Sequence, residues 1–231
     1  MSTVQGLPDF KAKPCGDSAV MFEFGVTIDP WLNACVNALD RAVRKRQLAG
    51  IVETIPTYRA LMIHYDPCLI SYRRLTDAVR ELSAMTDISD RSDVGAHWRV
   101  PVAYGDNFGM DFSEMAARSG LTHEQLIDLH TSRPYLVYQF GFSPGIALLG
   151  KIDACLEHPR RAEPRPIIPA GSIVIAGLQT AIISLPVHSG WHIVGRTPVR
   201  AFDLERDPMF IFNPGDSVSF FAIEEEQWSQ L

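Results

Sequence analysis

Cysteine is scarce in this chain of 231 residues, and its four thiols lie far apart in the sequence. None forms a C-x-x-C pair, and a zinc site needs clustered thiolates or imidazoles, so we expect no metal site in this chain. The first ten residues lack the basic head and apolar stretch of a signal peptide. Unpaired thiols without an export signal predict a cytoplasmic protein. The four residues are Cys15, Cys35, Cys68 and Cys155.

Basic residues are in deficit, because 21 Lys and Arg stand against 27 Asp and Glu, which gives a net charge of −6. A protein that binds duplex nucleic acid usually carries a basic surplus, so we predict no nucleic-acid partner. With 46% hydrophobic and 21% charged residues, the composition is that of an ordinary globular protein. The length allows one large domain or two small ones.

Charged residues are absent from one long stretch, residues 166–195. A membrane-spanning helix needs about 20 apolar residues, so this stretch must be weighed as a candidate. It is interrupted by prolines and glycines, among them Pro169, Gly177 and Pro186, and it is rich in Ile and Val. That pattern favours two buried strands around turns, and we predict no membrane association.

Residues 1–86 predict a small α+β domain with the element order β-α-β-β-α. Asp29 before Pro30 predicts the start of the first helix and Gly50 predicts its end, while apolar residues at helical spacing over 75–82 predict the second. Two helices on one face of an antiparallel sheet make a ferredoxin-like sandwich. The expected strands are 19–24, 51–55 and 60–65.

Residues 87–98 are polar without an apolar period and predict a linker, after which residues 99–231 predict a mainly-β domain. A short helix is expected over 111–119, and Thr122 with Gln125 forms a capping box that opens another. The rest of the chain is strand-like and is broken by Gly and Pro every 8–12 residues. This spacing is typical of a barrel or a sandwich.

The most unusual local sequence is HPRRAEPR at residues 158–165. Arginine forks bind carboxylate or phosphate with two parallel hydrogen bonds, and the prolines limit the entropy lost on binding. Residues 133–200 also carry a local charge of +4 within an acidic chain, which favours an anion site. The alternative is a solvated loop with internal pairing, for instance to Glu157 or Glu163. The candidate anion ligands are Arg160, Arg161 and Arg165.

Two other motifs lead to no specific chemistry, and one common hydrolase motif is missing. Residues 145–152 match most of a phosphate-binding loop, but Ile152 stands where Ser or Thr would hold magnesium, so we predict a core segment instead. His188 and His192 flank Trp191 in a strand context and do not form the helical histidine pair of a metal site. No G-x-S-x-G elbow is present, so a serine hydrolase of that type is not supported.

Ordered motifs over residues 15–222 resemble those of one known family. They include residues 16–19 (GDSA), 52–56 (VETIP), 100–105 (VPVAYG), 169–172 (PAGS), 195–198 (GRTP) and 214–216 (PGD). The chain resembles the 5-oxoprolinase B-subunit family, also called allophanate hydrolase subunit 1 or the sporulation-kinase-inhibitor family. The resemblance implies a ferredoxin-like N-terminal domain and a cyclophilin-like β-barrel.

The resemblance also implies an enzyme that works only as an assembly. Members act with a homologous C subunit and a third subunit in the ATP-dependent opening of a lactam, 5-oxoproline, to glutamate. ATP, with magnesium, would then bind at the level of the complex. The arginines at Arg160, Arg161 and Arg165 would act as catalytic anion clamps. The candidate substrate-binding residues are Gln179, Trp191, Arg196, Phe142 and His188.

Two departures from the family pattern leave other substrates open. Ile146 and Leu148 replace two aromatic residues, and Val187-His188-Ser189 replaces the usual segment before the tryptophan. One alternative is half of a carboxyltransferase acting on urea or a similar amide, which would need a biotin-bearing partner because this chain has no Met-Lys-Met sequence. The other is a non-catalytic module that inhibits a histidine kinase.

Overall fold

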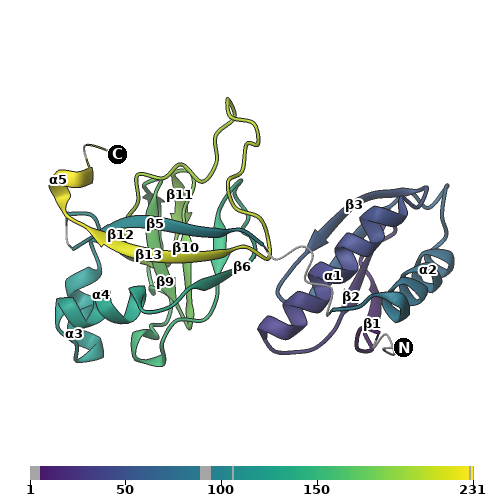
Figure 1. Ribbon diagram of the computed structural model, residues 1–231, viewed down its shortest axis with the longest axis horizontal. Helices are drawn as coiled ribbons and strands as arrows, with labels where there is room; N and C mark the ends of the chain where they lie inside the picture. The colour runs from purple at the N-terminus through teal and green to yellow at the C-terminus, as the bar shows by residue number, and fades with distance from the viewer. Residues whose placement is uncertain (1–5, 89–94, 106, 229, 231) are drawn as a thin grey trace. The chain divides into compact units, whose positions relative to one another are not determined.

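The chain divides into two compact units, with the division between Val94 and Gly95. The computed structural model describes residues 6–88, 95–105, 107–228 and 230, so most of the predicted linker lies outside the described residues. Together the units form a mixed α+β protein (Figure 1). Within the described ranges, no helix is both long and apolar enough to cross a membrane.

The N-terminal unit is a four-stranded antiparallel sheet in the order β1-β2-β4-β3, with helices α1 and α2. Helix α1 packs on β3, β4 and α2, and the core between them includes Phe22, Leu39 and Leu61. The elements are β1 (Lys11–Pro14), β2 (Ala19–Glu23), α1 (Pro30–Arg46), β3 (Ile51–Pro56), β4 (Ala60–Tyr65) and α2 (Tyr72–Met85).

The ends of α1 follow from local chemistry. The Asp29 carboxylate accepts hydrogen bonds from the N–H groups of Trp31 (2.8 Å) and Leu32 (3.2 Å), as the sequence predicts. The predicted end near Gly50 is wrong by several residues, because Gln47 already adopts the left-handed conformation, with φ of 48°. Its N–H then bonds the carbonyl of Arg44 and closes the helix.

Strand β1 is not predicted from the sequence, because it is a short, exposed edge strand with alternating lysines. Strands β2 and β3 are joined through α1 with β4 between them, which is a split β-α-β arrangement. At its other edge, β2 pairs with β1, the strand that precedes it in the sequence. A ferredoxin-like fold fills that position with a strand that follows the second helix, so this assignment stays a prediction.

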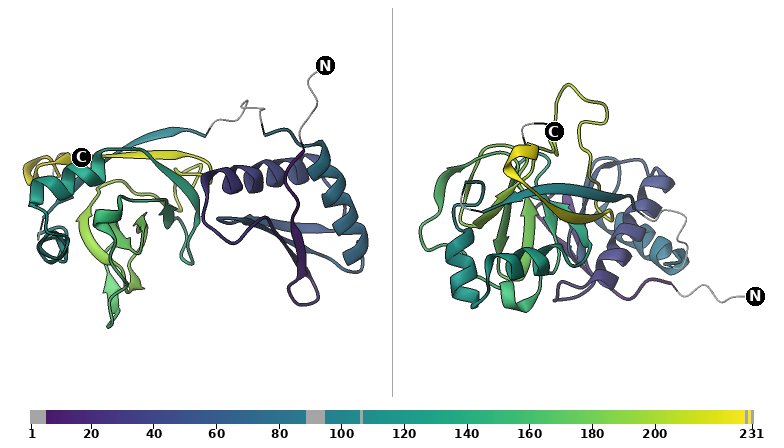
Figure 2. Two further views of the ribbon diagram at one scale, coloured as in Figure 1. Left: turned by 90° about the horizontal axis from the view of Figure 1, so that it is seen from below. Right: turned by 60° about the vertical axis from the view of Figure 1, so that its left-hand side comes forward.

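The C-terminal unit contains a closed seven-stranded barrel in the order β10-β7-β6-β13-β5-β12-β9, which confirms the predicted barrel. All neighbours are antiparallel except β5 and β13, which run parallel. The connection from β12 to β13 projects from the barrel (Figures 1 and 2). The barrel strands are β5 (His97–Tyr104), β6 (Tyr135–Phe140), β7 (Ala147–Leu149), β9 (Ser172–Ala176), β10 (Gln179–Ile182), β12 (His192–Arg196) and β13 (Ser217–Ile223).

The remaining elements surround the barrel. They include a separate two-stranded ribbon, β8 with β11, which lies largely within the charge-free stretch 166–195. That stretch therefore folds into more strands than the two predicted. The elements are α3 (Phe112–Ser119), α4 (His123–Thr131), a 3₁₀ turn (Ala154–Leu156), β8 (Arg165–Ile168), β11 (Val187–Ser189) and α5 (Glu225–Trp228).

Strand β5 begins at His97, two residues before its predicted start. Trp98 explains the difference, because its ring packs edge-on against Phe212 and its Nε1–H donates to Asp216 (3.0 Å). Asp216 is 4% exposed and also accepts hydrogen bonds from the N–H groups of Ala96 and Asn213, both at 2.8 Å. This carboxylate therefore ties the start of β5 to the turn before β13.

A neutral polar network lies inside the barrel around His130, at the end of α4. The two ring nitrogens of His130 contact the hydroxyls of Tyr104 (2.7 Å) and Thr180 (3.0 Å), and the Tyr135 hydroxyl donates to the His130 carbonyl (2.8 Å). The imidazole also stacks on Phe220. Complete burial lowers the pKa of His130 to about 3, so the ring is neutral at ordinary pH.

Candidate functional site

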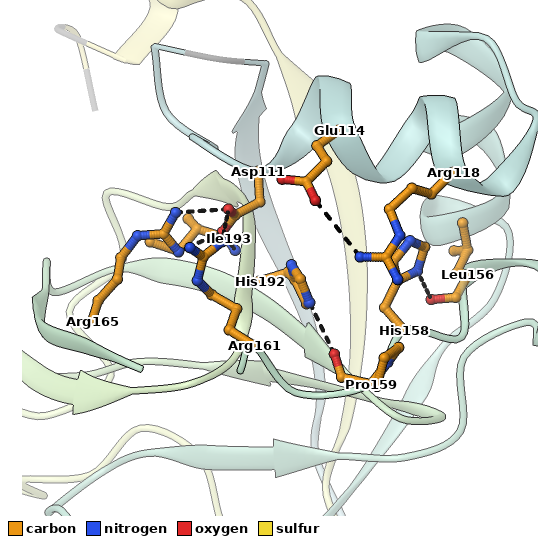
Figure 3. A network of polar contacts seen from close by, with 10 residues as sticks. All are labelled: Asp111, Glu114, Arg118, Leu156, His158, Pro159, Arg161, Arg165, His192 and Ile193. Carbon is orange, nitrogen blue, oxygen red and sulfur yellow. Dashed lines mark hydrogen bonds and ion pairs between the residues drawn. The ribbon is translucent and has the colours of Figure 1, made fainter. Parts of the chain in front are cut away.

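Asp111 lies at the centre of a network of charged side chains in the C-terminal unit (Figure 3). The residue is 1% exposed, and its carboxylate accepts four hydrogen bonds. Arg165 donates from Nη1 and Nη2, each at 2.7 Å, and Arg161 donates from Nη1 at 2.8 Å. The fourth donor is the N–H of Ile193 (2.8 Å). We call Asp111, Arg161 and Arg165 the Asp111 cluster.

The local backbone explains why Asp111 reaches this place. Its own N–H donates to the Ile193 carbonyl (3.0 Å), so the loop before α3 is tied to β12 at two points. Gly109 permits this approach, because a Cβ there would lie 2.2 Å from the carbonyl carbon of Val194. Asp111 occupies the N-cap position of α3 yet makes no capping hydrogen bond. It thereby forgoes a contact that contributes about 0.5–2 kcal/mol in other helices.

The surroundings of the Asp111 carboxyl keep it ionised. Burial alone raises its pKa, but the hydrogen bonds from Arg165 and the Ile193 N–H, with the charges of Arg165 and Arg161, outweigh burial and lower the pKa below its usual range. Two guanidiniums and one carboxylate leave a net charge of +1 in the Asp111 cluster. The cluster can therefore accept one further negative charge.

The carboxylate that pairs with the arginines is neither of the two glutamates that the sequence suggested as partners. Arg161 and Arg165 pair with a residue 50 and 54 positions earlier, and not with Glu157 or Glu163. Both side chains remain partly exposed, at 27% and 21%. Asp111 was not predicted from the sequence, because it begins the helix expected over 111–119, and an aspartate in the first turn of a helix needs no further explanation. The one available signal was that three clustered arginines need a counter-charge.

Arg160 and Trp191 lie beside the Asp111 cluster at the start of β12. The exposed Arg160 guanidinium stands 5.8 Å from the centre of the Trp191 ring, within the range of a cation–π contact. The Arg161 N–H donates to the carbonyl of Gly190 (2.8 Å), which joins the arginine segment to the residue before Trp191. The tryptophan packs against an apolar cluster outside the barrel, made of Ile146, Ile168, Val174, Ala181, Ile183 and Ile193.

Two buried histidines anchor the other end of the arginine segment (Figure 3). His192 donates from Nε2 to the Pro159 carbonyl (2.9 Å), and His158 contacts the Leu156 carbonyl through Nδ1 (3.2 Å). Their ring centres are 5.6 Å apart. Burial, with a smaller effect of the nearby Arg118, lowers the pKa of His158. These contacts hold the segment against β12.

Comparison with known proteins places the chain in a family. A family model described as the carboxyltransferase domain, subdomain C and D, matches residues 10–212. The B subunit of 5-oxoprolinase from Bacillus subtilis (strain 168) is 34% identical over 229 residues, which cover 95% of each chain. The chain belongs to the 5-oxoprolinase B-subunit family. The resemblance seen in the sequence is thus confirmed.

Another member of the 5-oxoprolinase B-subunit family and one solved structure are also similar to this chain. The B subunit of 5-oxoprolinase from Escherichia coli O157:H7 is 39% identical over 186 residues, covering 80% of this chain and 84% of that protein. The crystal structure of TTHA0988 matches 89% of this chain with a TM-score of 0.80 and 32% identity. The present chain spans only 40% of that longer chain.

The structure does not gather all the candidate site residues. Arg196 ends β12, five residues beyond Trp191, where its Nη2 donates to the Ala170 carbonyl (3.1 Å) and its guanidinium lies 5.3 Å from the Trp228 ring centre. The other three candidates make none of the hydrogen bonds described for the Asp111 cluster. These are Phe142 (83% exposed, between β6 and β7), His188 (exposed, on β11) and Gln179 (half-buried, at the start of β10).

The segment that resembles a phosphate-binding loop serves the barrel instead. Residues 147–149 form β7, with Ala147 and Leu149 in the barrel core, and Lys151 is exposed to solvent. This segment therefore provides no cradle of N–H groups for a phosphate. In the part of the chain that the structure describes, no three His, Cys, Asp or Glu side chains lie close enough together to hold a metal ion.

Proposed function

We propose that this chain is the B subunit of an ATP-dependent 5-oxoprolinase, which opens 5-oxoproline to glutamate together with a homologous C subunit and a third subunit. The observation that carries the proposal is the 34% identity to the Bacillus subtilis protein over 95% of both chains. A likeness that covers both chains almost completely favours the same role in the same kind of assembly.

The Asp111 cluster supports a part in binding this substrate. 5-Oxoproline carries a carboxylate, and the cluster has a net charge of +1 and two partly exposed guanidiniums. In the proposed site, Arg161 binds the substrate carboxylate or the phosphate of an activated intermediate, while Arg160 and Trp191 form a wall beside the ring. Gln179 is proposed to orient a polar group of the substrate.

Opening an unstrained lactam is energetically uphill and needs coupling to ATP. The net reaction consumes one water at the lactam C–N bond and one at the phosphoanhydride of ATP. If the lactam oxygen accepts a phosphoryl group, negative charge develops where guanidiniums can stabilise it. Because residues 145–151 form a core strand and its flanks, we assign no nucleotide step to them. ATP and magnesium are proposed to bind at the level of the complex.

The finer features of the prediction fit this proposal. The split β-α-β arrangement of β2, α1 and β3 supports a ferredoxin-like N-terminal domain, in which β1 takes the place of the strand after the second helix, and the closed barrel supports a cyclophilin-like C-terminal one. The four cysteines are all free thiols, which supports a cytoplasmic protein.

A second candidate function is half of a carboxyltransferase acting on an amide. It is favoured by the description of the matching family model, the carboxyltransferase domain. The same arginines would then hold a carboxylated intermediate. The two functions differ in their co-substrates, because the transferase needs a biotin-bearing protein and the hydrolase needs ATP and water alone.

Reconstitution tests the proposal. The full chain, co-purified with its C subunit and third subunit, should hydrolyse ATP faster when 5-oxoproline is added. Arg165→Ala should lower this stimulated rate by about 10- to 1000-fold, equivalent to roughly 1.4–4 kcal/mol. Arg133→Ala is the matched control, because Arg133 also pairs with a carboxylate, Asp153 (2.9 Å), on the exposed surface of the same unit. A complete complex without lactam-stimulated turnover would disprove the proposed function.

A further inference from the structure

The Asp111 cluster is asymmetric in the way its two arginines are used. Arg165 commits both terminal nitrogens to the carboxylate, in a two-pronged contact. Arg161 commits only Nη1, and its Nε is buried without a hydrogen-bond partner among the described residues. A buried N–H without an acceptor is unfavourable, and no hydrogen bond to a described residue uses Nη2 on the same edge of the guanidinium, so Nε and Nη2 form a donor pair for which the described residues supply no acceptor.

The position of this donor pair is fixed from several sides. Asp111 is tied to Ile193 through both its backbone N–H and its carboxylate, so the carboxylate cannot rotate without breaking contacts to β12. The Arg161 backbone N–H is bound to the Gly190 carbonyl. The Arg161 side chain is thus held at both ends, and 27% of it stays open to solvent, although Nε itself is buried, so an anion would have to approach this edge from the side of Nη2.

We propose that Asp111 is a positioning residue that holds the Nε–Nη2 edge of Arg161 ready for one carboxylate or phosphate group, with Arg165 as the brace. The identification of the anion as the substrate carboxylate rests on the proposed function; the anion site itself does not. Asp111 acts through Arg161 and does not touch the ligand.

The sign of one mutational effect distinguishes positioning from simple charge neutralisation. Asp111→Asn preserves the shape of the side chain and raises the charge of the cluster from +1 to +2. If Asp111 only offsets charge, the variant binds anions more tightly. If it positions Arg161, the variant binds more weakly in spite of the added charge, because Arg161 loses its fixed orientation.

Calorimetric titration of the full chain with 5-oxoproline, and separately with sodium phosphate, measures this sign. We expect wild type to bind at least one of these anions, and Asp111→Asn to weaken that binding by about 10-fold or more. The matched control is Asp216→Asn, which removes another buried carboxylate of the same unit without touching an arginine and should bind like wild type. Tighter binding by Asp111→Asn, or equal weakening by Asp216→Asn, would overturn the inference. So would a wild-type chain that binds neither anion.

Three further variants keep the test decisive if Asp111→Asn does not fold. Asp111→Glu retains the charge but moves the carboxylate by one methylene, and should weaken binding several-fold. Arg161→Lys retains a positive charge but lacks the two-pronged edge, and should lose more affinity than Arg165→Lys. Wild-type affinity in Asp111→Glu, or a greater loss in Arg165→Lys, contradicts the assigned roles.

Steady-state kinetics in the reconstituted complex separate this inference from the proposed function. Asp111→Asn should raise KM for 5-oxoproline more than it lowers kcat, whereas a general loss of structure lowers the active fraction and leaves KM unchanged. If the complex does not turn over 5-oxoproline while phosphate binding follows the expected order, the function is wrong and the anion site stands. If turnover occurs with an unchanged KM in Asp111→Asn, the inference fails and the function stands.

Discussion

Two buried aspartates of the C-terminal unit, Asp111 and Asp216, have different roles with the same side chain. Asp216 accepts hydrogen bonds from two backbone N–H groups and one indole N–H, all of them neutral. Asp111 accepts three of its four from guanidiniums. The first carboxylate closes a joint between strands. The second gathers charged side chains at a partly exposed place.

The difference teaches which buried charges point to function. A carboxylate that satisfies only main-chain and core donors stabilises the fold, and nothing is left over for a ligand. A carboxylate that holds two arginines leaves an excess positive charge and unused N–H donors. Burial alone does not distinguish Asp216 from Asp111, which are 4% and 1% exposed. The identity of the donors does.

The largest stability effect is expected at Asp216. Asp216→Ala leaves the N–H groups of Ala96, Asn213 and Trp98 without their acceptor, and each costs about 1–3 kcal/mol. We expect the free energy of unfolding in urea to fall by about 3–5 kcal/mol. Asp153→Ala removes a surface carboxylate as the control and should cost less than about 1 kcal/mol. If the loss at Asp216 is no larger than the loss at the control, Asp216 does not stabilise the fold by tying the start of β5 to the turn before β13.

A somewhat smaller effect is expected at the Asp111 cluster, where a double-mutant cycle gives the coupling. Arg165→Ala leaves a buried carboxylate with one arginine fewer and should cost about 2–3 kcal/mol of unfolding free energy. Adding Asp111→Ala to this variant should cost less than Asp111→Ala costs in the wild-type protein, because the contact with Arg165 is already lost, whereas those with Arg161 and the Ile193 N–H are lost in both cases. Urea unfolding of both single variants and the double variant measures the coupling. Additive losses would mean that the pair is not coupled in the folded state.

The smallest effect is a pH dependence that separates the charged cluster from the neutral His130 network. The pKa of His130 is about 3 in the folded protein and 6.5, its ordinary value, in the unfolded chain, so the unfolded chain binds more protons between these values. The stability from this histidine is complete above about pH 6.5 and is lost as the pH falls. Between about pH 7.5 and pH 5.0 the unfolding free energy should drop by about 2 kcal/mol.

His130→Gln provides the check on this pH dependence, since it should remove the contribution of His130 and leave that of His158, whose pKa burial also lowers, while His188→Gln at an exposed position should leave the contribution of His130 in place. The lowered pKa of Asp111 predicts a separate loss of stability only below about pH 4, since the unfolded carboxyl takes up its proton there first. An unchanged profile in His130→Gln would show that another group titrates in this range.

The sequence predicts much of the fold because many of its signals are local. The cap at Asp29, the capping box of Thr122 with Gln125, and the left-handed Gly120 (φ 66°) each act within one turn of helix. Strand β1 escapes prediction because its lysines face solvent and its pairing with β2 alone makes it a strand.

The site is predicted only in part for the same reason. The arginines are visible as a cluster in the sequence, but their counter-charge lies 50 positions away, where Asp111 looks like a helix cap. What brings the two together is the approach of the Gly109 loop to β12, a contact of the folded barrel. Sequence patterns show which groups need partners, and only the fold shows which partners they receive.

The parallel pairing of β5 with β13 means that the barrel cannot close until late in translation. Residues 97–103 align with residues 217–223, a separation of 120 positions. At about 5–20 residues per second, translation delivers the second strand roughly 6–24 s after the first. Until then the barrel has an open seam and the edge of β5 is bare, whereas the sheet of the N-terminal unit has all its strands by residue 65. A nascent chain thus emerges with one finished unit and one that needs protection from unwanted strand partners.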